Sequence, residues 1–177
     1  AGLDWDWING DTLQAAGLER GALVVPGGQR YAAVLLPGID ALPAEVAERL
    51  ANCADAGLVV RCTDRVPQRE AGLHDHAACD RRVQAAMARA LQAAPQPLAP
   101  SAIGRHLRAA GVAPALDLPA GHGLAFHVRT DGEAQCWAFL SNPSATDAVA
   151  DLALPAGQGA ELWHAWTGRI ERLAADG

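Results

Sequence analysis

A strand, a helix and a second strand follow one another closely in the first third of the chain, and this order limits the possible folds more than any other feature. The apolar run 31–37 ends at a Pro-Gly pair and predicts a strand that is buried on both faces. Residues 43–55 place apolar side chains on one face of a helix, Gly57 is positioned to end it, and a second apolar run, 58–60, follows. Strands connected through a helix in this way pair in parallel, so the sequence predicts a βαβ unit.

The rest of residues 1–114 fits the same class of fold. Further elements are predicted as short strands at 5–8 and 23–25, the second near the central strand, and as helices at 10–16, from Asp80 to just before Pro95, and from a cap at Ser101 to Gly111. We therefore predict an α/β domain with an open, mainly parallel sheet in three layers, of the flavodoxin-like kind, over residues 1–114.

The character of the sequence changes after Pro114. Short apolar runs are separated by turn residues such as Asn142-Pro143 and Thr167-Gly168, at 116–118, 124–130, 135–142, 148–154, 160–163 and 169–173. Runs of this kind predict an antiparallel meander. Residues 115–177 are therefore expected to form an antiparallel β extension, part of a β-sandwich. An incomplete sandwich leaves open edges and an apolar face, so self-association through this extension is expected as well.

Composition excludes several classes of protein. The chain has 177 residues, half of them hydrophobic, and a formal net charge of −6 without a basic cluster, so nucleic acid is a poor partner. No apolar stretch is long enough to span a membrane, so no membrane partner is expected. Nucleotide-binding glycine motifs are missing, and no cofactor is predicted. The four cysteines have no CxxC spacing and are expected to be mostly buried free thiols.

Two groups of residues in the first 114 could carry chemistry. His74, His76 and Cys79 offer ligands that zinc accepts, but their spacing matches no strong zinc signature, and a polar surface loop at 63–79 is the simpler interpretation. Cys62 follows a strand at the sheet edge where α/β folds place nucleophiles. The glycine-flanked turn that a nucleophile needs is missing, so a free-standing cysteine-dependent hydrolase is only the third hypothesis.

Aromatic composition points to sugars, although less strongly than to packing. The five tryptophans outnumber Phe and Tyr together, and flat indoles stack on sugar rings, but in a small β layer they more often form the core. No pair of carboxylates has neighbours that would separate their pKa values as glycoside hydrolysis requires, so no catalytic residue is assigned.

Several phrases, in order, resemble one family. They are DWDWINGDTL at 4–13, GALVVPGGQRY at 21–31, FHVR at 126–129, CWAFLSN at 136–142 and ELWHAWTGRI at 161–170. Together they are similar to the C-terminal half of bacterial α-L-rhamnosidases of glycoside hydrolase family 106. Val128 interrupts a His-Arg pair of the family pattern, and His164 replaces an aspartate.

The resemblance implies a non-catalytic part of such an enzyme. In that family the catalytic acids belong to a (β/α)8 barrel, while the matching region implies a glutamine-amidotransferase-like domain that runs into a β-sandwich. The expected function is an accessory, structural domain of a glycoside hydrolase in carbohydrate metabolism, with the parent chain's barrel as partner and a periplasmic or secreted location. The alternative is a carbohydrate-binding module, for which the candidate residues are Trp163, Trp166, His127 and Arg129.

Overall fold

The computed structural model describes residues 2–116, 118, 123–131, 135–149, 151–152 and 159–173. It divides into two compact units. One unit is Trp5–Ala113, and the other combines Ala1–Asp4 with Pro114–Gly177. Each unit is described by itself below.

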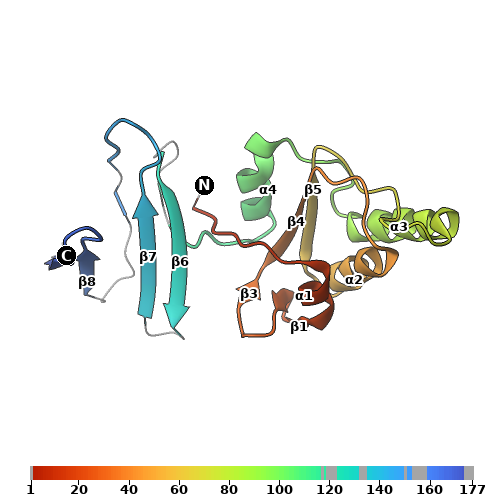
Figure 1. Cartoon of the computed structure of the whole chain (residues 1–177), viewed down its shortest axis with the longest axis horizontal. Helices are drawn as coiled ribbons and strands as arrows, with labels where there is room; N and C mark the ends of the chain where they lie inside the picture. The colour runs from red at the N-terminus through yellow and green to blue at the C-terminus, as the bar shows by residue number, and fades with distance from the viewer. Residues whose placement is uncertain are drawn as a thin grey trace. The chain divides into compact units, whose positions relative to one another are not determined.

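The predicted βαβ unit is present in the first of these units. Strand β4 (Ala33–Pro37) is followed by helix α2 (Ala44–Asp55) and strand β5 (Val59–Thr63). The two strands pair in parallel, with Ala33 opposite Val59 and the pairing continuing to the last residue of each strand (Figure 1). The expectation of a parallel strand–helix–strand core is therefore confirmed.

A side-chain cap defines the start of α2, and a glycine defines its end. The Ala44 N–H at its start donates to Glu70 Oε2 over 2.7 Å, so a carboxylate from a distant loop caps the helix. Gly57, with φ of 100°, ends it in the left-handed conformation that glycine tolerates best. Hydrogen bonds from the Gly72 and Ala44 N–H groups lower the pKa of Glu70, because they favour its charged form.

Helix α3 (His76–Ala90) packs along α2 and completes the core. It begins four residues before the predicted start at Asp80, and its apolar stripe is buried as expected, including Val83 and Met87. On the outer surface of this helix pair, Arg82 binds both carboxylate oxygens of Glu48, at 2.8 and 2.9 Å. The buried residues of this helix pair and of the β4–β5 pair belong to one apolar cluster.

The predicted open parallel sheet is only partly present, since the described residues contain a parallel sheet of two strands. The segment 23–25, expected as a short strand near the central one, forms a strand one residue earlier, and this strand belongs to a separate antiparallel sheet. That sheet consists of β1 (Gly17–Glu19), β2 (Ala22–Val24) and β3 (Arg30–Tyr31). Positive φ values at Arg20 and Gly21 make the β1–β2 turn a tight two-residue hairpin, which pairs these strands with each other.

Three further elements differ from their predictions or refine them. Helix α1 (Gly10–Ala15) is capped by Asn9, whose side chain accepts from the Thr12 N–H at 2.8 Å, whereas the predicted strand at 5–8 is not formed. Ser101 does not cap a helix with its side chain. It lies inside the 3-10 helix η1 (Pro100–Ala102), which leads directly into α4 (Ile103–Ala109).

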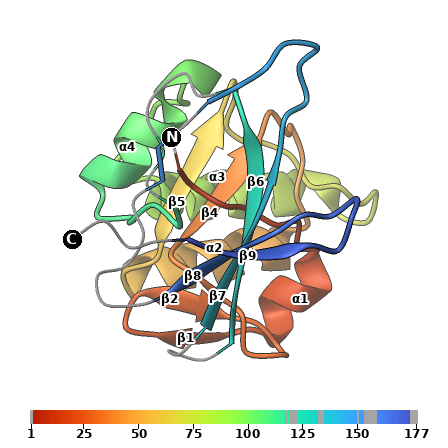
Figure 2. The ribbon, with the colours of Figure 1, turned by 90° about the vertical axis from the view of Figure 1, so that its left-hand side faces the viewer.

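The described residues of the second unit form two antiparallel strand pairs. Strand β6 (Ala125–Asp131) pairs with β7 (Gln135–Ser141), and β8 (Ala160–Trp163) pairs with β9 (Ile170–Leu173), which confirms the antiparallel prediction (Figure 2). The described parts of the runs 116–118 and 148–154 are not strands, and residues 117, 150, 153 and 154 lie outside the described residues.

The start of the chain belongs to this second unit through backbone hydrogen bonds. Gly2 O accepts from the N–H groups of Ala115 and Leu116, at 2.7 and 3.2 Å. Gly2 has φ of 72°, and a Cβ there would collide with the Leu116 carbonyl oxygen, so this close approach requires glycine. Over the described ranges, no helix has the length and hydrophobicity needed to cross a membrane.

Replacement of Leu36 tests the βαβ core. Leu36 on β4 is 8 % exposed, and Leu36→Ala should lower the free energy of unfolding by about 2–5 kcal/mol through lost burial and a residual cavity. Leu73→Ala is the matched control, because Leu73 is 94 % exposed and its loss should cost less than about 0.5 kcal/mol. Urea unfolding of both variants measures the difference, and equal values would place β4 outside the core.

Candidate functional site

One face of the β6–β7 hairpin combines aromatic and basic side chains. In the antiparallel register His127 lies opposite Phe139 and Arg129 lies opposite Trp137. Directly opposed residues in such a pair point to the same side of the sheet, and so do residues two apart in one strand. These four side chains therefore share one face, on which Trp137 is 48 % and Phe139 64 % exposed.

Strand β8 adds a second indole to this face. The rings of Trp163 and Trp137 lie edge to face, with centroids 5.3 Å apart and an interplanar angle of 90°. This is a favourable geometry for two aromatic rings. The Trp163 indole N–H donates to Glu161 Oε2 at 3.1 Å, and the ring remains 55 % exposed. We call the side chains of His127, Arg129, Trp137, Phe139 and Trp163 the aromatic face.

The imidazole at one end of the aromatic face is held by a carboxylate. Asp4 Oδ1 lies 3.1 Å from His127 Nδ1, and Asp4 Oδ2 accepts from the Val128 N–H at 2.8 Å. An ionised carboxylate only accepts hydrogen bonds, so the arrangement places a proton on Nδ1. Nε2 is then the ring nitrogen available to a ligand.

The expectation that the tryptophans form a core is wrong for all five. Trp5 and Trp7 form another edge-to-face pair and are both exposed, and Trp166 is 100 % exposed. Among the described residues, Trp137 and Trp163 lie on strand pairs with two members each. So thin a structure cannot cover an indole on all sides.

The structure brings together some of the predicted sugar-binding residues and separates another. The aromatic face includes three of them: His127 and Arg129 on β6, and Trp163 on β8. Trp166 lies in the turn between β8 and β9 and takes part in no ring pair among the described residues. Trp137 was not predicted as a site residue, because its place opposite Arg129 depends on a register that includes Asp131 in the first strand.

The predicted metal ligands are not gathered into a site. His74 and His76 are exposed, and Cys79 is half-buried on α3, where its sulfur accepts from Arg82 Nη1 at 3.8 Å. Asp80 is engaged elsewhere, since its carboxylate accepts from the Glu70 N–H at 2.7 Å. Within the described ranges, no three His, Cys, Asp or Glu side chains are arranged to hold a metal ion.

Burial makes Cys62 unsuitable as a nucleophile. It is buried at the carboxyl end of β5, and the burial raises the pKa of its thiol from 9.0 to about 11. A reactive cysteine needs the opposite shift, because the thiolate is the nucleophile. Cys53 is also buried, whereas Cys79 is half-buried and Cys136 is exposed, so the prediction of buried thiols holds for two of the four.

Two carboxylates in the first unit have perturbed pKa values, and both shifts oppose acid catalysis. A hydrogen bond from Arg82 lowers the pKa of Glu48, and backbone hydrogen bonds lower that of Glu70. A general acid in glycoside hydrolysis requires a raised pKa. These two side chains therefore act as structural partners.

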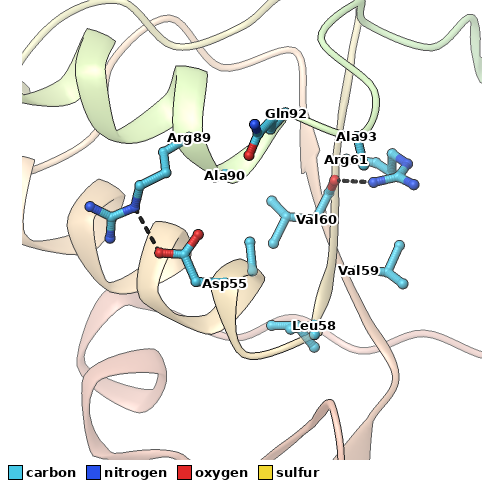
Figure 3. Close-up of a pocket in the computed structure, with 11 residues that line it drawn as sticks. Asp55, Leu58, Val59, Val60, Arg61, Arg89, Ala90, Gln92 and Ala93 are labelled. Atoms are coloured by element: carbon cyan, nitrogen blue, oxygen red, sulfur yellow. Dashed lines mark hydrogen bonds and ion pairs between the residues drawn. The ribbon is translucent and has the colours of Figure 1, made fainter.

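A hollow of about 580 Å³ lies between the ends of α2 and α3 and the start of β5 (Figure 3). At its rim Arg89 Nε and Asp55 Oδ2 form an ion pair at 3.0 Å. The Arg61 side chain points away from the hollow and donates to Val60 O at 2.8 Å. Open α/β sheets bind ligands at the carboxyl ends of their strands, and this hollow lies at the opposite end of β5.

Comparison with known families places the chain among the glycoside hydrolases. The model of glycoside hydrolase family 106, α-L-rhamnosidase, matches residues 1–176, and the chain belongs to this family. The family resemblance inferred from the sequence phrases is thereby confirmed. No curated protein and no solved structure matches the chain.

Thiol labelling tests the assignment of Cys62. With Ellman's reagent at about pH 8, exposed Cys136 should react first, half-buried Cys79 more slowly, and Cys62 and Cys53 only on unfolding. Because the folded pKa of Cys62 lies above the ordinary 9.0, its contribution to stability is complete below pH 9.0 and is lost as the pH rises through about 11. Cys136→Ser should remove the fast phase and Cys62→Ser should leave it unchanged. Fast labelling that Cys62→Ser abolishes would restore the nucleophile hypothesis.

Proposed function

We propose that the chain is a non-catalytic accessory part of a glycoside hydrolase of the α-L-rhamnosidase family, in carbohydrate metabolism. The observation that carries this proposal is the family match over residues 1–176. The uses of the acidic side chains support it. Asp4 orients His127, Glu70 caps α2 and Glu48 pairs with Arg82. These roles are structural, and the catalytic acids are then supplied by a partner, the (β/α)8 barrel of the parent enzyme.

The incomplete sheet of the first unit agrees with an accessory role. The Leu98 N–H donates to Cys62 O at 2.8 Å, and Leu98 forms a parallel bridge with Thr63, so a third segment begins to pair beside β5. We propose that β4 and β5 are the centre of a flavodoxin-like or glutamine-amidotransferase-like sheet whose further strands pair at its edges. A strand edge with unpaired backbone groups readily accepts another strand.

An activity assay tests the accessory role. The purified chain should not hydrolyse 4-nitrophenyl α-L-rhamnopyranoside, and a family member with an intact barrel serves as the positive control. Turnover by the chain that is abolished by a single carboxylate substitution would overturn the proposal. Glu48→Gln and Glu161→Gln are suitable first variants, because one carboxylate is bound to Arg82 and the other lies beside the aromatic face.

A second candidate function is carbohydrate binding by the aromatic face. The specific observation in its favour is the pair formed by Trp137 and Trp163, both about half exposed and next to hydrogen-bonding side chains. Flat apolar rings bind the C–H faces of sugars, while His127 and Arg129 supply hydrogen bonds to hydroxyl groups. In this candidate the predicted residue Trp166 is peripheral, and Trp137 takes its place.

Self-association of the second unit is a further proposal, and Phe139 provides its test. The unit exposes several large apolar side chains, among them Phe139 and Ile170, and Leu152 is half-buried, while Leu154 lies outside the described residues. Phe139→Glu and Leu152→Glu should shift the chain toward monomer in light scattering over a concentration series. Val149→Glu is the control, because Val149 is exposed outside the strands. A wild-type chain that remains monomeric at high concentration would contradict the proposal.

A further inference from the structure

Arg129 differs from the other two arginines of its unit, Arg169 and Arg172. Arg169 pairs with Glu171, and Arg172 Nε lies 3.8 Å from Glu161 Oε1. Arg129 is exposed on the aromatic face, and no described residue provides it with a carboxylate. It is therefore a cation with no neutralising partner in the described part of the unit, directly opposite an indole.

The two described carboxylates beside the aromatic face already have partners. Asp4 accepts from His127 Nδ1 and from the Val128 N–H, and Glu161 accepts from the Trp163 indole and faces Arg172. The oxygens of these two carboxylates are thus already engaged. Among the described residues of the aromatic face, Arg129 is the basic side chain that no carboxylate pairs with.

We propose that the aromatic face binds a sugar that carries a carboxylate, the uronic acid of an acidic oligosaccharide. The sugar ring stacks on the exposed indole surface of Trp137 or Trp163, and the carboxylate binds the Arg129 guanidinium. A guanidinium matches a carboxylate with two parallel hydrogen bonds, and such charge-assisted bonds are stronger than neutral ones. The inference rests on the carbohydrate-binding candidate above and specifies its ligand.

The charge balance distinguishes this ligand from others. A neutral sugar would use the indoles but leave the guanidinium without an anion. A sugar phosphate carries nearly two charges at neutral pH, whereas the face offers one uncompensated arginine. Each uronate ring carries one negative charge on a planar group, which matches one guanidinium in charge and in shape.

Binding of trigalacturonate to the full chain, followed by tryptophan fluorescence and calorimetry, tests the inference. The matched ligand is trigalacturonate methyl ester, which has the same rings without the charge, and inorganic phosphate and galactose 6-phosphate test other anions. The variants are Arg129→Gln and Trp163→Ala, with Arg81→Gln, an exposed arginine of α3, as the charge-matched control. Circular dichroism confirms that each variant is folded.

The uronate should bind and change the indole fluorescence, and the ester should bind about threefold to tenfold more weakly. Arg129→Gln should reduce uronate affinity by the same factor and leave binding of the ester unchanged. Trp163→Ala should weaken the binding of both trisaccharides. Arg81→Gln should alter the binding of neither trisaccharide. Equal affinity for the uronate and the ester, or tighter binding of a phosphate, would overturn the inference while leaving carbohydrate binding in place. No binding of either trisaccharide would overturn both the inference and the carbohydrate-binding candidate, without affecting the accessory role.

Discussion

Burial of one apolar seam between α2, α3 and the inner face of the β4–β5 pair is the constraint on which the first unit depends. Leu50 of α2, Met87 of α3 and Val60 of β5 meet there with almost no exposure. Because β4 and β5 are parallel, the connecting helix has to cross one face, and its apolar stripe is the complement of that face. The same burial raises the pKa of Cys62. The packing that stabilises the βαβ unit is thus the reason that its thiol cannot serve as a nucleophile.

In the second unit, by contrast, large aromatic side chains are exposed rather than buried. Each strand pair formed by its described residues has two members, and no helix of this unit is found among those residues. Trp137, Phe139 and Trp163 consequently remain about half exposed or more. Exposure of this extent is costly for a domain that acts alone, and it is typical of a surface that binds a ligand or another part of an assembly. Both roles proposed for the chain, accessory contact and carbohydrate binding, use this property.

Periodicity predicted the elements whose side chains repeat over several turns or several strand residues. The stripe of Val83 and Met87 identified α3, and the apolar run before Pro37 identified β4. One feature had no such signal. The Arg20-Gly21 turn separates β1 and β2 from the parallel pair through local backbone geometry, which hydrophobic patterns do not reveal.

In the candidate site, residue type could be predicted from the sequence, whereas the pairing of strand residues could not. His127, Arg129 and Trp163 were predicted from residue type and family resemblance, but Trp137 required knowledge of which strand residues face one another. Exposure of the tryptophans was mispredicted for a related reason. Burial depends on how many layers cover a strand, and the sequence of one strand does not report the layers above it.

The contact between Asp4 and His127 is another long-range feature, because the two residues are 123 positions apart in sequence. The first unit is encoded between them, and the opening segment pairs instead with residues that follow it, through Gly2, Ala115 and Leu116. Closing so long a loop has an entropic cost that grows only slowly with length, so a few hydrogen bonds and their surrounding contacts can offset it. The Asp4 carboxylate aligns both the His127 ring and the Val128 N–H, which orders β6 where it carries the aromatic face. The opening family phrase thus includes a residue whose hydrogen bonds orient part of the aromatic face.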